Sequence, residues 1–226
     1  MNSKKNFSFG DKILEILENS LDLEEDDFVA WKVARIKRDP FKILVAIILS
    51  QNTIEKNTLR AYVNLDRTIG VTPENIFNVD ITRLKEAIRI AGLQDAKARA
   101  IKMLSTIIVK KLGGDSYKLE DMDIDKIQKI LRNIPGIGRK TIDVFLANIG
   151  YPILPIDTHI KRVSYRIGLA DYKSYEKMQM ELHRVFRPKV RLKAHMYLIK
   201  LGRTYCKALR PKCDICPVRE YCIKRV

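Results

Sequence analysis

Four cysteines close to the C-terminus are the residues whose types and spacing suggest chemistry most directly. Cys206, Cys213, Cys216 and Cys222 follow the pattern C-x6-C-x2-C-x5-C, and the chain has no other cysteine. Thiolates this close together favour a single metal centre. The spacing alone leaves both zinc and an iron–sulfur cluster open, because only Cys213 and Cys216 form the C-x2-C pair typical of zinc sites.

A second motif, Ile134-Pro135-Gly136-Ile137-Gly138-Arg139-Lys140, has the form of a helix-hairpin-helix turn. Gly136 and Gly138 allow positive φ angles and place no side chain between the backbone and a ligand. We expect amide N–H groups at the start of the next helix to bind one DNA phosphate without reading the base sequence. An ordinary helix–helix turn is the alternative. The basic residues around the motif, Lys126, Lys129, Arg132 and Arg139, favour the phosphate site.

Lys140 ends this motif, and Asp157 follows seventeen residues later, just after a proline that predicts a helix start. A lysine amine can act as a nucleophile, and a nearby carboxylate can accept its proton. Most such pairs near a phosphate site are surface charges, so the residue types alone favour a solvated pair. We interpret the histidines, His159, His183 and His195, as structural residues.

The elements that must position these residues are helical. Apolar residues recur at helical spacing in Asp11–Leu21 and in Asp95–Leu112. Asp39-Pro40 and Thr72-Pro73 each supply an N-cap and a first-turn proline. Further helices are predicted over Ile156–Leu169, Tyr172–Val185 and Val190–Tyr205. No hairpin signal separates two alternating runs, so the sequence predicts an all-α fold.

The charge of the chain indicates a polyanionic partner. Lysine and arginine outnumber aspartate and glutamate by 43 to 27, a formal net charge of +16. This surplus favours nucleic acid over an anionic membrane surface. The longest apolar run, Ile43–Leu49, is too short to span a bilayer, and the polar N-terminus lacks the apolar core of a secretory signal. We therefore expect a cytoplasmic protein without a membrane partner, a setting that disfavours disulfides.

The motifs together resemble the endonuclease III family of DNA glycosylases. The matching residues are Ile134–Thr141, Ile156–Val163 and the four cysteines, within a similarity that extends from about Pro40 to Cys222. The resemblance implies an all-α, two-lobed helix-hairpin-helix glycosylase fold with a C-terminal iron–sulfur cluster loop. One lobe, residues 34–153, holds the hairpin. The other, residues 1–33 with 154–226, holds Asp157 and the cluster loop.

The resemblance also implies a reaction. It predicts base excision repair by a bifunctional DNA glycosylase and abasic-site lyase that removes oxidised pyrimidines. Lys140 attacks the sugar C1′ and forms a Schiff base, and β-elimination follows. Asp157 accepts the lysine proton or stabilises positive charge on the sugar. We expect Lys140 to be partly buried beside Arg139. The four cysteines then ligate one [4Fe-4S] cluster.

The family's DNA contacts carry over to particular residues. Gln51 fills the gap left by the flipped base, and Leu93 props the stack apart. The hairpin residues Gly136, Ile137, Gly138 and Arg139 bind phosphate, as do Lys207, Arg210 and Lys212 in the cluster loop. The simpler readings are a polar C-cap for Gln51, a core leucine for Leu93 and a solvated basic loop. The expected partner is double-stranded DNA with a damaged base or abasic site, bound by a monomer.

Two departures from the family pattern leave the substrate open. Ile54 stands where many members have an acidic residue, and Arg132 stands where some have glutamate. A uracil or thymine mismatch glycosylase on the same scaffold is one alternative. A non-catalytic helix-hairpin-helix DNA-binding module is another, although phosphate binding requires neither Lys140 nor Asp157.

Overall fold

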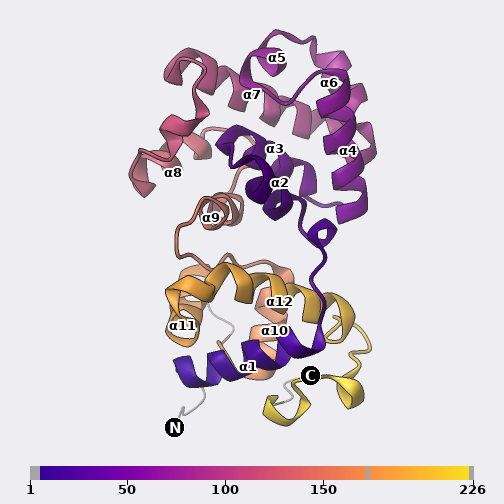
Figure 1. The fold of residues 1–226 in the computed structure, drawn as a ribbon, viewed down its shortest axis with the longest axis vertical. Helices are drawn as coiled ribbons and strands as arrows, with labels where there is room; N and C mark the ends of the chain where they lie inside the picture. Colours follow the sequence, from indigo (N-terminus) through magenta and orange to yellow (C-terminus); the bar gives the residue numbers. More distant parts are fainter. Residues whose placement is uncertain (1–5, 172–173, 224–226) are drawn as a thin grey trace. The chain divides into compact units, whose positions relative to one another are not determined.

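The chain divides into two compact units in the computed structural model, which describes residues 6–171 and 174–223. Glu24–Ile149 form the hairpin unit, and Met1–Leu23 with Gly150–Val226 form the cluster unit. The sequence prediction puts these boundaries after residues 33 and 153. All regular elements in the described part of the chain are helices (Figure 1), which confirms the predicted all-α fold.

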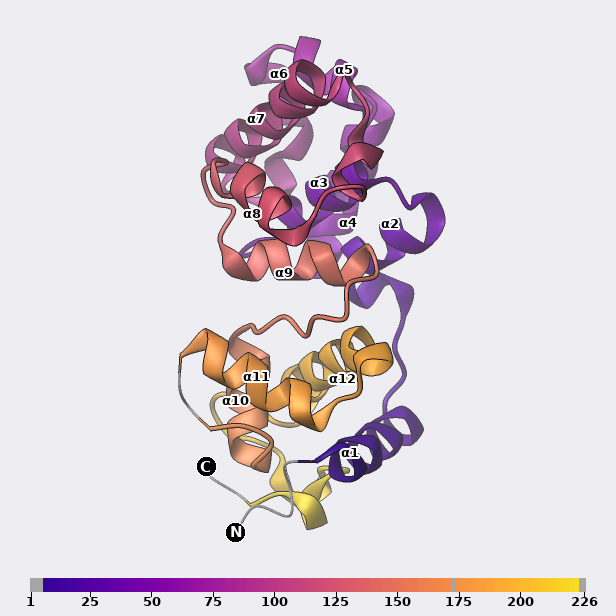
Figure 2. The same ribbon diagram turned by 90° about the vertical axis from the view of Figure 1, so that its left-hand side faces the viewer.

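The hairpin unit is a set of helices built around one buried helix, α3. Its α-helices are α2 (Val29–Lys37), α3 (Pro40–Ser50), α4 (Glu55–Thr68), α5 (Pro73–Asn78), α6 (Ile81–Ile88), α7 (Gln94–Leu112), α8 (Ile124–Arg132) and α9 (Arg139–Asn148). Short 3-10 helices are η1 (Glu25–Asp27), η2 (Arg89–Ala91) and η3 (Ser116–Leu119). Figure 2 shows α8 and α9 side by side, with the hairpin turn joining them.

The sequence of α3 explains its central place. Asp39 accepts hydrogen bonds from the N–H groups of Phe41 at 2.9 Å and Lys42 at 3.3 Å, and Pro40 takes the first helical position. Nine of the eleven helix residues are buried, because the helix is apolar on nearly all sides. It packs against α2, α4, α7 and α9. Truncating the fully buried Phe41 to alanine would cost about 3–5 kcal/mol.

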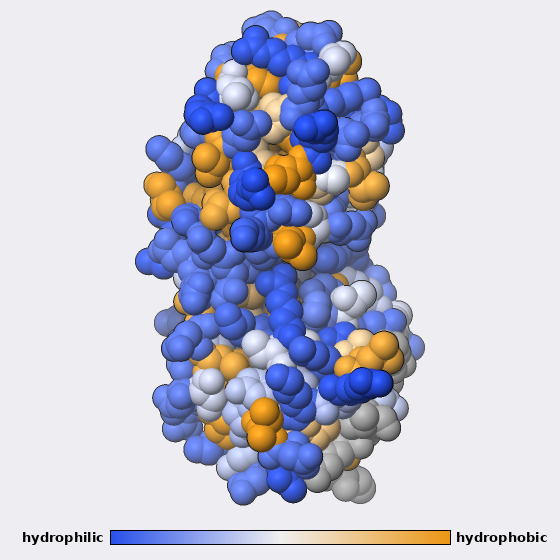
Figure 3. All heavy atoms as spheres, turned by 90° about the vertical axis from the view of Figure 1, so that its right-hand side faces the viewer, coloured by the Kyte–Doolittle hydropathy of each residue, from blue (hydrophilic) through white to orange (hydrophobic). Residues whose placement is uncertain are grey.

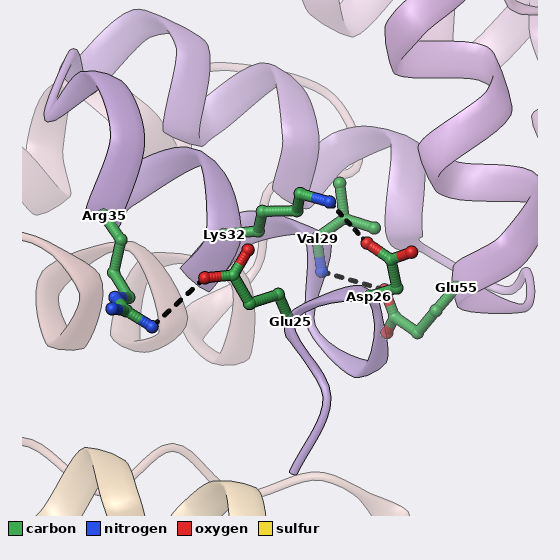
Figure 4. Close-up of polar contacts among 6 residues, drawn as sticks. All are labelled: Glu25, Asp26, Val29, Lys32, Arg35 and Glu55. Carbon is green, nitrogen blue, oxygen red and sulfur yellow. Dashed lines mark hydrogen bonds and ion pairs between the residues drawn. The ribbon is translucent and has the colours of Figure 1, made fainter.

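Polar contacts fasten the start of α2 to α4 (Figure 4). The N–H group of Val29 donates to Glu55 at 3.3 Å, so the first residue of α4 caps α2. Lys32 pairs with Asp26 at 2.6 Å, and Arg35 pairs with Glu25 at 3.3 Å. The Glu55 contact anchors one end of the short loop between α3 and α4.

The cluster unit consists of α1 (Phe7–Ser20), α10 (Thr158–Ile167), α11 (Tyr175–Val185) and α12 (Arg191–Thr204), with 3-10 helices η4 (Pro188–Val190), η5 (Cys213–Ile215) and η6 (Arg219–Tyr221). Helix α12 packs on α10 and α1, and α1 also packs on α11. Gly10 permits the close approach of α1 to α11, because a Cβ atom there would lie 1.9 Å from the carbonyl oxygen of Val185.

The outer surface is mainly polar. The face in Figure 3 is largely hydrophilic, with hydrophobic residues scattered over it. Within residues 6–171 and 174–223, no helix is both long enough and apolar enough to cross a bilayer.

Candidate active site and iron–sulfur centre

Lys140 is the second residue of α9, and its side chain is exposed within the hairpin unit. The expected partial burial is therefore wrong for this unit. Its neighbours Thr141 and Ile142 begin the buried face of α9, which leaves Lys140 on the outer side of the first turn. The Arg139 Nε atom lies 3.9 Å from Oδ2 of the buried Asp143, an i,i+4 contact that aligns Arg139 along the helix.

The hairpin turn is anchored by two isoleucines and exposes its glycines. Ile134 and Ile137 are buried, and the N–H group of Ile137 donates to the carbonyl of Ile134 at 3.0 Å. Gly136 has a φ of +82°. Gly138 has a φ of −94° and acts as the N-cap of α9 without a side-chain bond, so only Gly136 needs the predicted positive φ. A helix N-terminus that no side chain caps has backbone N–H groups that can bind an anion.

Gln51 reaches the hairpin from the end of α3. Its side-chain nitrogen donates to the carbonyl of Gly136 at 3.0 Å and to the hydroxyl of Thr141 at 3.2 Å. A residue far away in the sequence is thereby held against the turn that precedes Lys140. The structure brings Gln51, the hairpin and Lys140 together within one unit.

Leu93 occupies the loop between η2 and α7. Its side chain is 57% exposed, so the reading of Leu93 as a core residue is wrong. The backbone has a φ of +49° and is left-handed, a conformation that costs energy in a leucine. An exposed apolar side chain on a strained turn is typical of a binding residue.

Asp157 is the N-cap of α10, the helix start that the sequence predicts. Its Oδ1 atom accepts a hydrogen bond from the N–H group of Ile160 at 2.7 Å, and the residue is half-buried. This contact fixes the orientation of the carboxylate, because rotating the side chain would break the helix cap.

The extended segment before Asp157 is held by side chains of α11 and α12. The N–H group of Leu154 donates to His183 Nε2 at 3.1 Å, and Gln179 donates to the carbonyl of Leu154 at 3.1 Å. The buried His195 donates from Nδ1 to the carbonyl of Pro155 at 2.9 Å. Burial lowers the pKa of His183 to about 4, which keeps it a neutral acceptor. Both histidines are therefore structural, and they position Asp157.

His159 is also a structural residue in this geometry. Arg162 donates to its Nδ1 atom at 3.1 Å, so this ring nitrogen must be an acceptor. Burial lowers the pKa of His159 below its ordinary value, and Arg162 acts in the same direction. The neutral ring lies against α12, where a Cβ atom on Gly202 would come within 2.9 Å of it.

All four cysteines line one cavity of the cluster unit. None of them, all in the described part of the chain, forms a disulfide. Among residues 6–171 and 174–223 no three His, Cys, Asp or Glu side chains gather as ligands of a single metal ion. The four sulfurs instead surround a shared space, and the donor set of four thiolates suits an iron–sulfur cluster.

Arginines of α10 hold the cysteine segment in place. Arg166 donates from Nη1 to Cys206 Sγ at 3.7 Å and to the carbonyl of Lys207 at 2.7 Å. Arg162 donates to the carbonyls of Cys206 at 2.9 Å and Gly202 at 3.0 Å. Helix α10 thus carries Asp157 at its start and contacts the cysteines through its later turns.

The loop between the first two cysteines presents its cations to solvent. Lys207, Arg210 and Lys212 are all exposed. The N–H groups of Lys207 and Lys212 both donate to the carbonyl of Tyr205 at 2.9 Å, which closes the loop at its base. A fixed loop with exposed cations is suited to phosphate contact.

Sequence reasoning missed the residues that act on backbone carbonyls and amides. No local pattern gives Lys97, Arg162, Arg166 or Gln179 this role, and each is recognised only by its contacts. One usable signal was the extended segment between Pro152 and Pro155, whose buried backbone groups require partners from elsewhere in the fold.

Comparison with known proteins identifies the family. Residues 45–188 match the HhH-GPD superfamily of base excision DNA repair proteins. Residues 206–222, which begin and end at cysteines, match the iron–sulfur binding domain of endonuclease III.

Individual relatives agree with this assignment. The chain is 35% identical to endonuclease III of Sulfolobus acidocaldarius, over 91% of this chain and 92% of that one. A non-covalent endonuclease III–DNA complex superposes with a TM-score of 0.77 at 26% identity, covering 99% of this chain and 96% of that one. A trapped endonuclease III–DNA covalent intermediate gives a TM-score of 0.72 at 27% identity, covering 95% of both chains.

The cysteine segment, the hairpin and its lysine, and the capping aspartate now have a common explanation. The four cysteines bind an iron–sulfur cluster, as the sequence predicts. The chain belongs to the endonuclease III family of base excision repair enzymes, the DNA glycosylases with abasic-site lyase activity.

Proposed function

We propose that this protein excises oxidised pyrimidines from duplex DNA and cleaves the strand at the resulting abasic site, with Lys140 as the nucleophile. The exposed Lys140 in the first turn of α9, directly after the helix-hairpin-helix turn, is the observation that carries the proposal. Phosphate binding alone does not require a lysine at this point, whereas a lyase requires an amine beside the bound strand.

The reaction begins at the sugar. The neutral Lys140 amine forms a bond to C1′ while the glycosidic bond breaks and the base departs. The lysine nitrogen gives up a proton, the C1′–O4′ bond of the sugar ring opens with O4′ becoming a hydroxyl, and the resulting iminium acidifies the proton on C2′. Loss of that proton breaks the C3′–O bond and releases the 3′ strand with its phosphate. Water then hydrolyses the Schiff base and frees Lys140.

Asp157 assists the proton transfer and the build-up of positive charge in this reaction. Its carboxylate takes a proton from the lysine or stabilises positive charge on the sugar as the base leaves. The N-cap bond from Ile160 to Oδ1 supports this role, because it holds the carboxylate in one orientation before substrate binds.

Binding is assigned to two groups of residues. In the hairpin unit, Gly136, Ile137, Gly138 and Arg139 bind phosphate, while Gln51 and Leu93 occupy the gap beside the flipped nucleotide. In the cluster unit, Lys207, Arg210 and Lys212 bind phosphate from the loop that the iron–sulfur cluster holds in shape. A [4Fe-4S] cluster on Cys206, Cys213, Cys216 and Cys222 acts there as a structural clamp. The trapped covalent endonuclease III–DNA intermediate among the similar structures supports a covalent mechanism for this protein.

Borohydride trapping tests the proposal. Wild-type protein incubated with an abasic-site duplex and borohydride should form a stable covalent complex, and Lys140→Ala should form none. Lys111→Ala, a change of another exposed lysine, serves as the matched control and should trap normally. Equal trapping by Lys140→Ala would refute the nucleophile.

A panel of duplexes tests the substrate class. Duplexes with thymine glycol, a uracil–guanine mismatch or a thymine–guanine mismatch are incubated with and without alkali. We expect strand cleavage of the thymine glycol duplex without alkali. Excision of a mismatched base that needs alkali for cleavage would instead indicate the monofunctional mismatch enzyme, and no excision at all would indicate a binding module.

A further inference from the structure

One buried lysine of the hairpin unit has no part in the proposed chemistry. Lys97 lies in the first turn of α7 and is 2% exposed. Its ammonium donates to the carbonyl of Leu49 at 2.8 Å and to the carbonyl of Ala91 at 2.8 Å. A buried charge is costly unless its donors are satisfied, so the two carbonyls must account for its presence.

Both carbonyls lie at the base of a loop assigned to DNA. Leu49 is in the last turn of α3, two residues before Gln51. Ala91 is the last residue of η2, two residues before Leu93. The ammonium of Lys97 is therefore a direct bridge between the two segments that present the gap-filling side chains.

Electrostatics favours a cation at this point. The carbonyls at the C-terminal end of α3 carry the negative end of the helix dipole, and an ammonium there is stabilised by it. Burial lowers the pKa of Lys97 to about 8, so the side chain is still mostly charged at neutral pH. An apolar residue of the same length would leave two carbonyls of buried residues without this donor.

The loop at Leu93 needs such a restraint. Gly92 and Leu93 have φ angles of +69° and +49°, so two successive residues have positive φ and one of them has a branched side chain. The N–H group of Gly92 donates to the carbonyl of Arg89 at 3.0 Å, and Lys97 holds the carbonyl of Ala91, the residue before Gly92. Strained backbone persists only where its surroundings fix it.

We propose that Lys97 is a positioning residue that couples the Gln51 and Leu93 loops, so that the two loops approach the duplex as one rigid element from which each side chain enters the gap. The inference rests on the proposed gap-filling roles of Gln51 and Leu93. It adds that the two act together, and that the bridge through Leu49 and Ala91 is the physical cause.

A double-mutant cycle tests the coupling. Gln51→Ala, Leu93→Ala and the double variant are made in the wild-type and Lys97→Met backgrounds. The measurements are single-turnover excision and the fluorescence of 2-aminopurine opposite the lesion, which reports entry into the gap. In wild type the double variant should deviate from the product of the single effects by about threefold to tenfold. In the Lys97→Met background, the effect of the double variant should equal the product of the Gln51→Ala and Leu93→Ala effects.

A second lysine on the same helix supplies the matched control. Lys102 donates to the carbonyls of Ile76 and Phe77, with a further contact to Val79, and so bridges α7 to the end of α5, away from both loops. Lys102→Met should lower stability yet leave the Gln51–Leu93 coupling intact. Lys97→Arg, which keeps donors and charge, should restore part of the coupling that Lys97→Met removes.

The possible outcomes separate the inference from the function on which it rests. Independent effects of Gln51→Ala and Leu93→Ala in wild type would overturn the inference even if Lys97→Met fails to fold. Coupling that survives in Lys97→Met would overturn it as well, with the gap-filling roles intact. If neither single variant changes excision or fluorescence, the gap-filling roles themselves fail, and the inference fails with them.

Discussion

The two units position their functional groups by different means. In the hairpin unit, the loops and the hairpin stand at the ends of helices packed on the apolar α3, and Lys97 and Gln51 add side-chain bonds to backbone carbonyls. In the cluster unit, Asp157 follows a segment held by His183 and His195, and the cysteine loop is held by Arg162 and Arg166.

This difference predicts how the stability of each unit responds to substitutions. Apolar packing spreads its free energy over many contacts, so the hairpin unit should lose stability gradually as residues change. Polar contacts to backbone concentrate the restraint in a few atoms, and removing one partner leaves the other unsatisfied. The cluster unit should therefore respond sharply to single substitutions and to loss of metal.

The largest expected effect is on base excision when Asp157 is changed to a residue that still caps α10 but cannot act as a carboxylate. Asn caps a helix about as well as Asp, so Asp157→Asn should keep the fold while base excision slows by about 10²- to 10⁴-fold. Single-turnover excision measures the loss, and circular dichroism with a DNA-binding assay shows that fold and affinity remain. Near-normal turnover would mean that Asp157 is only a cap.

Loss of the cluster should affect one unit and spare the other. Cys213→Ser should abolish the visible absorbance of the iron–sulfur centre. It should also raise amide exchange about tenfold or more in the cysteine loop and the later turns of α10. Exchange in α3 and α7 should stay as in wild type. Equal deprotection of both units would show that the contrast between them is wrong, and a colourless wild type that contains zinc would remove the cluster itself.

A charge reversal in the cysteine loop should weaken DNA binding moderately. Arg210→Glu should reduce affinity about tenfold for any duplex sequence and lower the slope of log affinity against log salt by about 1. Arg67→Glu on α4 makes the same charge change on the hairpin unit and should have a smaller effect. If Arg210→Glu leaves the affinity and the salt slope unchanged, the loop is solvated and does not contact DNA.

A final expected effect, visible only at alkaline pH, is a pH dependence of stability at Lys97. The folded pKa of Lys97 is lowered to about 8 by burial, whereas an unfolded lysine titrates near about 10.4. Between these values the unfolded chain binds more protons, so stability rises with pH. Urea unfolding from about pH 8 to about pH 10.4 should show wild type gaining stability relative to Lys97→Met. A constant difference would contradict the lowered pKa.

Local signals in the sequence predict much of the fold. Asp39-Pro40 and Thr72-Pro73 mark the starts of α3 and α5, and Gly113 ends α7 in a left-handed conformation. These signals act within a few residues and need no knowledge of the tertiary structure. The helix predicted over Ile156–Leu169 is shorter, because Asp157 caps it and Thr158 is its first residue.

Other features depend on contacts between distant residues and leave no local pattern. Gly138 looks like a left-handed glycine but is extended, because it caps α9 while Gly136 makes the turn. Lys140 is exposed because the buried positions of α9 begin one residue later, at Thr141. Lys97 looks like any lysine near a helix start. Its burial follows from the packing of α7 against α3.

The hydrogen bonds of Gln51 to Gly136 and Thr141 have a consequence for searching along DNA. While these bonds hold, the side chain is stored on the protein and does not obstruct sliding on an intact duplex. Insertion exchanges them for bonds to an unpaired base, an exchange close to neutral in free energy. An intact base pair leaves no such base, so we expect Gln51 to stay on the hairpin until a nucleotide has left the stack.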